Sequence, residues 1–125
     1  MILVDTAIWI NHLRTPSKLL IQLLDLEQVL THPFVIGEVA CGNLINRKEI
    51  ISLLLALPSA QKVDDEELLY FVERHRLMGR GLGLVDMHLL ASSHLEAAAI
   101  WTNDNNLRLA ARHLGNDFGQ QSVGG

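Results

Sequence analysis

Cysteine is almost absent from this chain of 125 residues, which contains only Cys41. A lone cysteine cannot form a disulfide within the chain, so the composition fits a reducing compartment such as the cytoplasm. Cysteine-rich zinc sites are excluded, and the histidines show no HExxH spacing, so we interpret them as surface or packing residues. We expect Cys41 to be a small core residue rather than a nucleophile.

Long apolar runs are also missing. The longest, residues 50–57, contains Ser52 and ends at Pro58, far short of the roughly 20 residues that cross a membrane. The apolar start of the chain is too short for a signal peptide, has no basic residue and is interrupted by Asp5. We therefore expect a soluble, cytoplasmic protein with no membrane partner.

Basic residues are outnumbered, because 10 Lys plus Arg stand against 14 Asp plus Glu, giving a formal net charge of -4. This balance excludes a protein that binds nucleic acid through a large positive charge alone. It does not exclude nucleic-acid binding in which divalent cations offset part of the acidic charge.

The length and the 49% hydrophobic content fit one domain, residues 1–125, with its own core. Strands are predicted at residues 2–4, 28–31, 61–63 and 98–102. Helices are predicted at residues 6–14, from Pro16 through the leucines at 19, 20, 23 and 24, and at 34–44, 48–57, 64–77, 86–97 and 106–114. The glycine-bearing loop 78–84 has no phosphate-binding motif. We expect residues 115–125 to form a polar tail with a mobile end. The alternation predicts an α/β domain with a mainly parallel sheet and helices on both faces.

Four acidic residues occupy unusual positions in this pattern. Asp5 follows the first strand and Asp104 follows the last, so a parallel sheet would bring both to one edge. Glu38 falls on the apolar face of its predicted helix together with Cys41, and we expect it to point toward the core or a cleft. Asp86 starts a helix after the glycine-bearing loop. The capping of a helix is a simpler explanation for each aspartate, and Glu38 would face solvent if the helix were phased differently.

Bringing four carboxylates together is costly, since two unit charges about 4 Å apart repel by about 4 kcal/mol at an effective dielectric constant of about 20. Such a cluster raises pKa values unless a cation is bound. Oxygen ligands without thiols or clustered imidazoles suit Mg²⁺ or Mn²⁺, and two such ions can promote phosphodiester cleavage. The acids therefore predict a metal-dependent phosphoryl-transfer site.

Four segments, ILVDTAIWI, FVIGEVACG, LVDMHLLAS and AAIWTNDNNL, occur in this order. Together they resemble the PIN-domain ribonucleases, specifically the VapC-like toxins of bacterial and archaeal toxin–antitoxin pairs, over the chain as far as about Leu114. The resemblance implies a PIN-like three-layer sandwich and a Mg²⁺- or Mn²⁺-dependent endoribonuclease. The implied catalytic and metal-binding residues are Asp5, Glu38, Asp86 and Asp104, with Asp5 and Asp86 as the principal ligands and with Thr6 and Thr102 in support. The chain departs from the pattern in the asparagines around Asp104 and in a tail without a clear final strand.

The resemblance also implies partners: an RNA substrate such as tRNA or rRNA, a cognate antitoxin, and a second copy in a homodimer. Arg74, Arg76 and Arg80, with His75, are candidates for holding RNA phosphates. They could equally form the solvated C-terminal end of a helix, where basic side chains interact favourably with the negative end of the helix dipole. The apolar helices at residues 19–26 and 50–57 could bury partners or belong to the core. A non-catalytic PIN-like module that binds RNA or protein is the alternative to the enzyme.

Overall fold

The computed structural model describes residues 1–119 and contains a parallel sheet of three strands in the order β2-β1-β3. The strands are β1 (Ile2–Val4), β2 (Val29–Leu30) and β3 (Ala99–Trp101). In the register, Ile2 of β1 pairs with Val29 on one side and with Ala99 on the other. Because all three strands run the same way, their carboxyl ends lie at one edge of the sheet.

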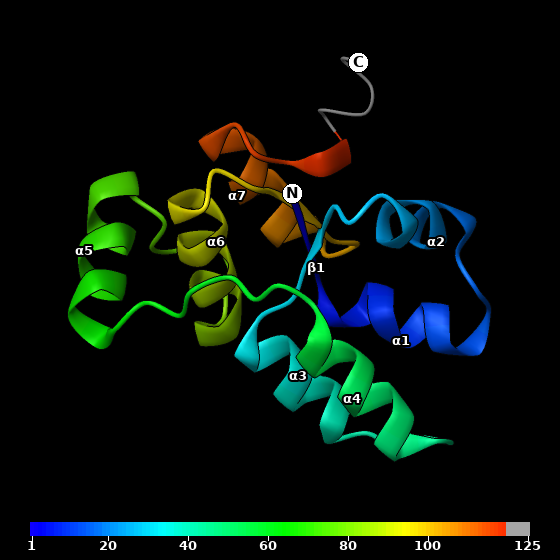
Figure 1. Ribbon diagram of the computed structural model, residues 1–125. Coiled ribbons are helices and arrows are strands. Elements are labelled where there is room, and N and C mark those ends of the chain that lie inside the picture. Colours follow the sequence, from blue (N-terminus) through cyan, green and yellow to red (C-terminus); the bar gives the residue numbers. More distant parts are fainter. Residues whose placement is uncertain (120–125) are drawn as a thin grey trace.

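Helices surround this small sheet (Figure 1). They are α1 (Thr6–Arg14), α2 (Lys18–Asp25), α3 (Pro33–Ala40), α4 (Arg47–Ala56), α5 (Asp65–His75), α6 (Leu84–Leu95) and α7 (Asn105–Leu114). In Figure 1, α3 and α4 lie side by side, and α5 packs along α6. The predicted α/β architecture with a parallel sheet and flanking helices is confirmed. None of the helices within residues 1–119 is both long enough and apolar enough to cross a membrane.

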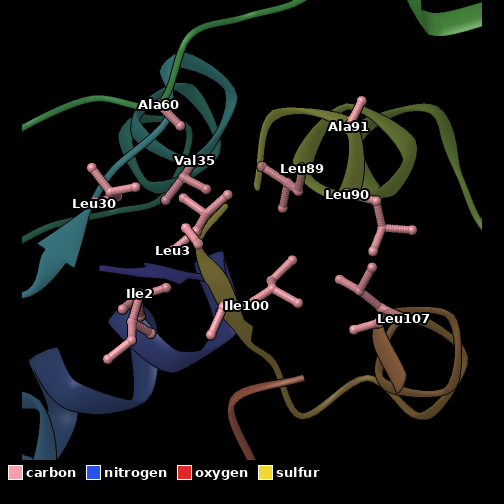
Figure 2. Close-up of a cluster of buried hydrophobic side chains, with 14 of the residues drawn as sticks. Ile2, Leu3, Leu30, Val35, Ala60, Leu89, Leu90, Ala91, Ile100 and Leu107 are labelled. Carbon is pink, nitrogen blue, oxygen red and sulfur yellow. The ribbon is translucent and has the colours of Figure 1, made fainter. Parts of the chain in front are cut away.

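The core lies where the sheet meets α3, α6 and α7. Figure 2 shows Leu3 of β1 near Val35 of α3 and Leu89 of α6, while Leu90 faces Leu107 of α7. All five side chains are fully buried. Burying a leucine or valine side chain contributes roughly 1.5–3 kcal/mol, so these contacts hold three helices against the sheet from which the carboxylates project.

Helix α5 begins as the acidic run predicted. The Asp64 carboxylate accepts a hydrogen bond from the Glu67 backbone N–H at 2.7 Å, and the Glu67 carboxylate accepts one from the Asp64 N–H at 3.1 Å. This reciprocal pair is a capping box. The interpretation of the run as a helix start is therefore confirmed. The helix ends earlier than predicted, because Arg76 adopts a left-handed conformation with φ of 53°.

Several predicted boundaries were wrong. Residues 61–63 form no strand, and Ser59 instead makes an isolated parallel bridge with Thr31. Helix α3 stops at Ala40 rather than at residue 44, and the Arg47 guanidinium donates hydrogen bonds to the carbonyls of Ala40 and Gly42 at that end. Helix α6 begins at Leu84 and ends at Leu95, two residues earlier than expected at each end.

The predicted polar tail begins with residues that belong to the fold. Asp117 bridges Ile100 of β3 in parallel and is buried. The Asn116 amide donates to the Ser93 hydroxyl at 2.9 Å and to the Ala98 carbonyl at 3.1 Å. Residues 116 and 117 therefore lie beside β3 through an isolated bridge, and residues 115–119 contain no further strand, as the sequence predicted for this tail. The expected mobile end, residues 120–125, lies outside the described residues.

A buried histidine ties the two helices that carry Glu38 and Asp86. His32 precedes α3, and its Nδ1 accepts a hydrogen bond from the Phe34 backbone N–H at 3.0 Å. The proton of the neutral ring is then on Nε2, which donates to the Ser92 hydroxyl of α6 at 3.0 Å. His32 thus caps α3 and joins it to α6 in its uncharged form only.

Stability should therefore fall on acidification. Burial, together with the smaller effects of the nearby His88 and Lys62, lowers the pKa of His32 from 6.5 to about 4. Between these two pH values the unfolded chain binds more protons than the folded chain, so stability is lost as pH falls from about 6.5 toward 4. The contribution of His32 over this window is roughly 3 kcal/mol. We expect His32→Asn, which keeps a capping acceptor, to show a shallower decrease in unfolding free energy, measured by urea denaturation at several pH values. Equal pH slopes for both proteins would contradict this assignment.

Candidate active site

Asp5 sits at the junction between β1 and α1. Its backbone N–H donates to the Trp101 carbonyl of β3 at 2.9 Å, which fixes the residue to the sheet. One carboxylate oxygen, Oδ1, accepts from the Thr6 N–H at 2.8 Å, so Asp5 caps α1. The other, Oδ2, accepts from the Thr102 hydroxyl at 2.7 Å. Asp5 is thus a helix cap, and two hydrogen bonds fix its carboxylate at this edge of the sheet. A role as a helix cap is therefore compatible with a role as a metal ligand.

Thr6 and Thr102 connect Asp5 to two other predicted acids. The Thr6 hydroxyl donates to Oε1 of Glu38 at 2.6 Å. The Thr102 hydroxyl, which donates to Asp5, also accepts from the Asp104 backbone N–H at 3.0 Å. A continuous hydrogen-bonded path therefore runs from Glu38 through Asp5 to Asp104 and joins three elements that are far apart in the sequence.

Glu38 and Cys41 do not lie where the sequence predicted. The buried stripe of α3 consists of Val35 and Val39, and Glu38 and Cys41 are exposed. The sequence predicted that Glu38 points toward the core or a cleft; the core alternative was wrong, as was the prediction that Cys41 is a core residue. Glu38 faces the edge of the sheet instead, where Thr6 holds its carboxylate.

Asp104 and Asp86 stand at the starts of α7 and α6. Asp104 caps α7, since its Oδ1 accepts from the Leu107 N–H at 2.8 Å. Asp86 lies within the first turn of α6, and its Oδ2 accepts from the Gly83 N–H at 3.2 Å. Capping therefore describes Asp5 and Asp104, while Asp86 binds back to the residue before its helix.

The four carboxylates influence one another electrostatically. Burial raises the pKa of Asp5, against the hydrogen bonds from Thr102 and Thr6, and the charges of Glu38 and Asp104 raise it further. Burial likewise raises the pKa of Asp86, the Gly83 hydrogen bond opposes this, and the other three acids add to the rise. The structure thus brings the four predicted acids into one site of negative potential.

Burial of these carboxylates, together with their mutual repulsion, predicts that the site destabilises the fold. Asp86→Asn removes one charge while its amide oxygen still accepts from Gly83, so we expect unfolding at neutral pH to become harder by roughly 0.5–2 kcal/mol. The sign follows from the raised pKa, because ionisation of such a group costs folding energy at pH values above it. Thermal unfolding at low salt measures the effect. A melting temperature that falls in the variant would show that the Asp86 charge has a stabilising partner.

The donor set fits a hard divalent cation. Each Asp5 oxygen that accepts one hydrogen bond keeps a further lone pair, and every acid in the site offers oxygen only. Within residues 1–119, no group of three or more His, Cys, Asp or Glu side chains is arranged to hold a metal ion directly. Mg²⁺ commonly uses only one or two carboxylates and retains several waters, so pairs drawn from this site suffice for it.

Comparison with known proteins gives the family. A family model described as the PIN domain matches residues 2–113. The chain belongs to the PIN-domain family. Two relatives, both named Ribonuclease VapC32 and found in the CDC 1551 and H37Rv strains of Mycobacterium tuberculosis, are 43% identical to it over 116 residues. The alignments cover 92% of this chain and 94% of each relative. The resemblance to VapC-like PIN domains is therefore confirmed, as is the PIN-like fold.

The basic residues of this PIN domain lie between α5 and α6. Arg74 is in the last turn of α5, Arg76 follows it, and Arg80 lies in the loop that leads to Asp86. All three are exposed, and the Arg80 Nε donates to the Arg76 carbonyl at 3.1 Å. Their position at a helix end agrees with the dipole interpretation, and their exposure leaves them accessible to a ligand.

Sequence reasoning missed two residues that shape the loop before Asp86. Gly81 has a φ of 75°, and a Cβ there would come within 2.6 Å of the Asn106 amide nitrogen. Asn106, in the first turn of α7, donates weakly to the Gly81 carbonyl at 3.5 Å. The alternating glycines of the loop could have indicated a left-handed backbone at Gly81. The contact with α7 could not be foreseen, because 25 residues separate Gly81 from Asn106.

Proposed function

We propose that this PIN domain is a Mg²⁺- or Mn²⁺-dependent endoribonuclease that acts as the toxin of a toxin–antitoxin pair. The observation that carries the proposal is the hydrogen-bonded path that holds Glu38, Asp5 and Asp104 together through Thr6 and Thr102. The name of the two relatives, Ribonuclease VapC32, supports the same activity. We propose one domain over residues 1–125.

The four acids have different roles in this proposal. Asp5 and Asp86 are the principal metal ligands, and Glu38 and Asp104 complete the charge or orient the attacking water. A divalent cation bound there supplies an activated water and neutralises charge on the scissile phosphate. Thr102 and Thr6 keep the Asp5 and Glu38 carboxylates in place, as residues behind metal ligands usually do.

The substrate is RNA, with tRNA and rRNA as the expected classes. We propose that Arg74, Arg76 and Arg80 hold phosphates that flank the acids, a role that positions a substrate without reading its sequence. Because the net charge is -4, this local basic surface and the bound cations have to provide the attraction that the whole molecule does not.

A cognate antitoxin and a second copy of this chain are the proposed protein partners. The apolar side chains of α2 and α4 lie partly in the core and partly on the surface. Leu20 of α2 and Leu54 of α4 are buried. Other large apolar side chains on α2 and α4, namely Leu19, Ile21, Leu53 and Leu55, are exposed. These exposed residues support an interface with another protein.

The test is cleavage of total cellular RNA by antitoxin-free protein with Mg²⁺ or Mn²⁺. We expect discrete fragments with either metal and none after addition of EDTA, and the fragment ends identify the cleaved RNA. Intact RNA under every metal condition would contradict the enzyme. Retained RNA or antitoxin binding in that case would favour the non-catalytic module.

A further inference from the structure

We propose that a cavity beside Thr102 is a binding subsite for an unpaired nucleotide of the substrate, next to the scissile phosphate; this inference rests on the proposed function. The cavity has a volume of about 330 Å³. Its lining includes Trp101, Asn103, Arg108, Arg112 and Phe118. It combines aromatic rings with guanidinium groups, the two side-chain types that bind the base and the phosphate of a nucleotide.

The cavity and the acidic site share Thr102. Thr102 lines it and donates a hydrogen bond to Oδ2 of Asp5. Asp104, Arg108 and Arg112 follow at intervals of four residues, so they lie along one face of α7. Arg108 is therefore about 6 Å and Arg112 about 12 Å beyond Asp104 along the helix axis. A strand whose scissile phosphate lies at the acids can place its next phosphates on this stripe.

The two arginines are not equivalent. Arg112 forms an ion pair with the buried Asp117, with 3.2 Å between Nε and Oδ2. Within residues 1–119, no ion pair involves Arg108, which is half-buried. Arg108 is therefore the cation that is available to a phosphate, whereas Arg112 mainly compensates the charge of Asp117.

Trp101 is the stacking residue of the proposed subsite. It is half-buried, and its ring lies 5.4 Å from that of Phe118, tilted by 42°. A base can use such an apolar surface only when it is not paired, because a paired base is enclosed in its duplex. The RNA bound at this subsite, near the cleavage point, is therefore single-stranded.

Trp101 fluorescence tests the subsite. The chain has two tryptophans, and Trp9 is buried with an indole N–H that has no partner among the described residues. Trp9→Phe therefore leaves Trp101 as the single reporter without breaking a hydrogen bond, and Asp5→Asn in the same protein prevents cleavage. The probes are a fluorescently labelled 20-nucleotide oligouridylate and, for comparison, the duplex of poly(A) with poly(U).

We expect oligouridylate to quench Trp101 and the duplex to leave its emission unchanged. Arg108→Gln should weaken oligouridylate binding about 5-fold or more and reduce its salt dependence by about one ion. Lys48→Gln, an equal charge change at an exposed position of α4, should leave binding unchanged.

Oligouridylate that raises the anisotropy of its label without quenching Trp101 would overturn the subsite, as would equal affinity for Arg108→Gln. Absence of any binding would overturn it as well. None of these results would affect the proposed ribonuclease, which is judged separately by metal-dependent cleavage of cellular RNA by the wild-type protein.

Discussion

Replacing Asp5 by asparagine is expected to reduce RNA cleavage by more than about 100-fold, beyond the 10- to 100-fold loss typical when a residue behind a metal ligand is changed. The amide side chain of this variant keeps an oxygen for the Thr6 N–H, so the cap of α1 should survive, but the negative charge that attracts the cation is lost. Initial rates of fragment formation at saturating Mn²⁺ measure the effect. Burial and the neighbouring acids raise the pKa of Asp5 in the metal-free protein, so at low Mn²⁺ concentration the rate should also fall on acidification, because protons compete with the cation for this carboxylate.

Two further variants separate chemistry from folding. Asp25→Asn changes an exposed aspartate at the end of α2 and should leave the rate unchanged. Thr102→Val removes the hydroxyl that orients Asp5 and should lower the rate about 10- to 100-fold, whereas Thr102→Ser should retain most of it. Near-normal cleavage by Asp5→Asn would remove this carboxylate from the mechanism.

Leu89→Ala is expected to destabilise the protein by about 2–5 kcal/mol, the range for removing a fully buried leucine. Leu89 has 0% exposure and lies between α6 and the sheet (Figure 2). It is one turn after Asp86, so its packing also determines where that carboxylate lies. Urea denaturation gives the change in unfolding free energy, and an unchanged slope would show that the unfolded state is unaffected.

The matched control for this prediction is on the same helix. Leu95 is 57% exposed, and Leu95→Ala should change stability by no more than about 0.5 kcal/mol. A loss of similar size in both variants would mean that helix propensity, rather than core packing, dominates on α6.

The sequence was sufficient to locate much of the site. Asp5 and Asp104 could be placed because each follows a short apolar strand, and parallel strands bring their ends to one edge. Glu38 lies beside Asp5 through Thr6, although the sequence argument placed it on a buried face of its helix. On the short helix α3, the buried stripe is only Val35 and Val39, so a side chain beside that stripe is exposed even though its neighbours in the sequence are apolar.

Other parts depend on contacts that no local pattern encodes. The hydrogen bond between His32 and Ser92 spans 60 residues, and either residue alone reads as an ordinary polar side chain. Asp117 reads as part of a polar tail and is buried only because the chain returns to β3 after α7. Cys41 is the exposed C-cap of α3, and such boundaries are the least predictable feature of a helix.

The position of β1 in the middle of the sheet has a consequence for synthesis on the ribosome. Asp5 leaves the ribosome early, but Thr102, which orients it, is 97 residues later. At translation rates of 5–20 residues per second, roughly 5–20 s separate the two. During that interval the central strand has no β3 partner, and the acids are not assembled. The proposed site therefore cannot assemble on a nascent chain until nearly all of the chain has been made.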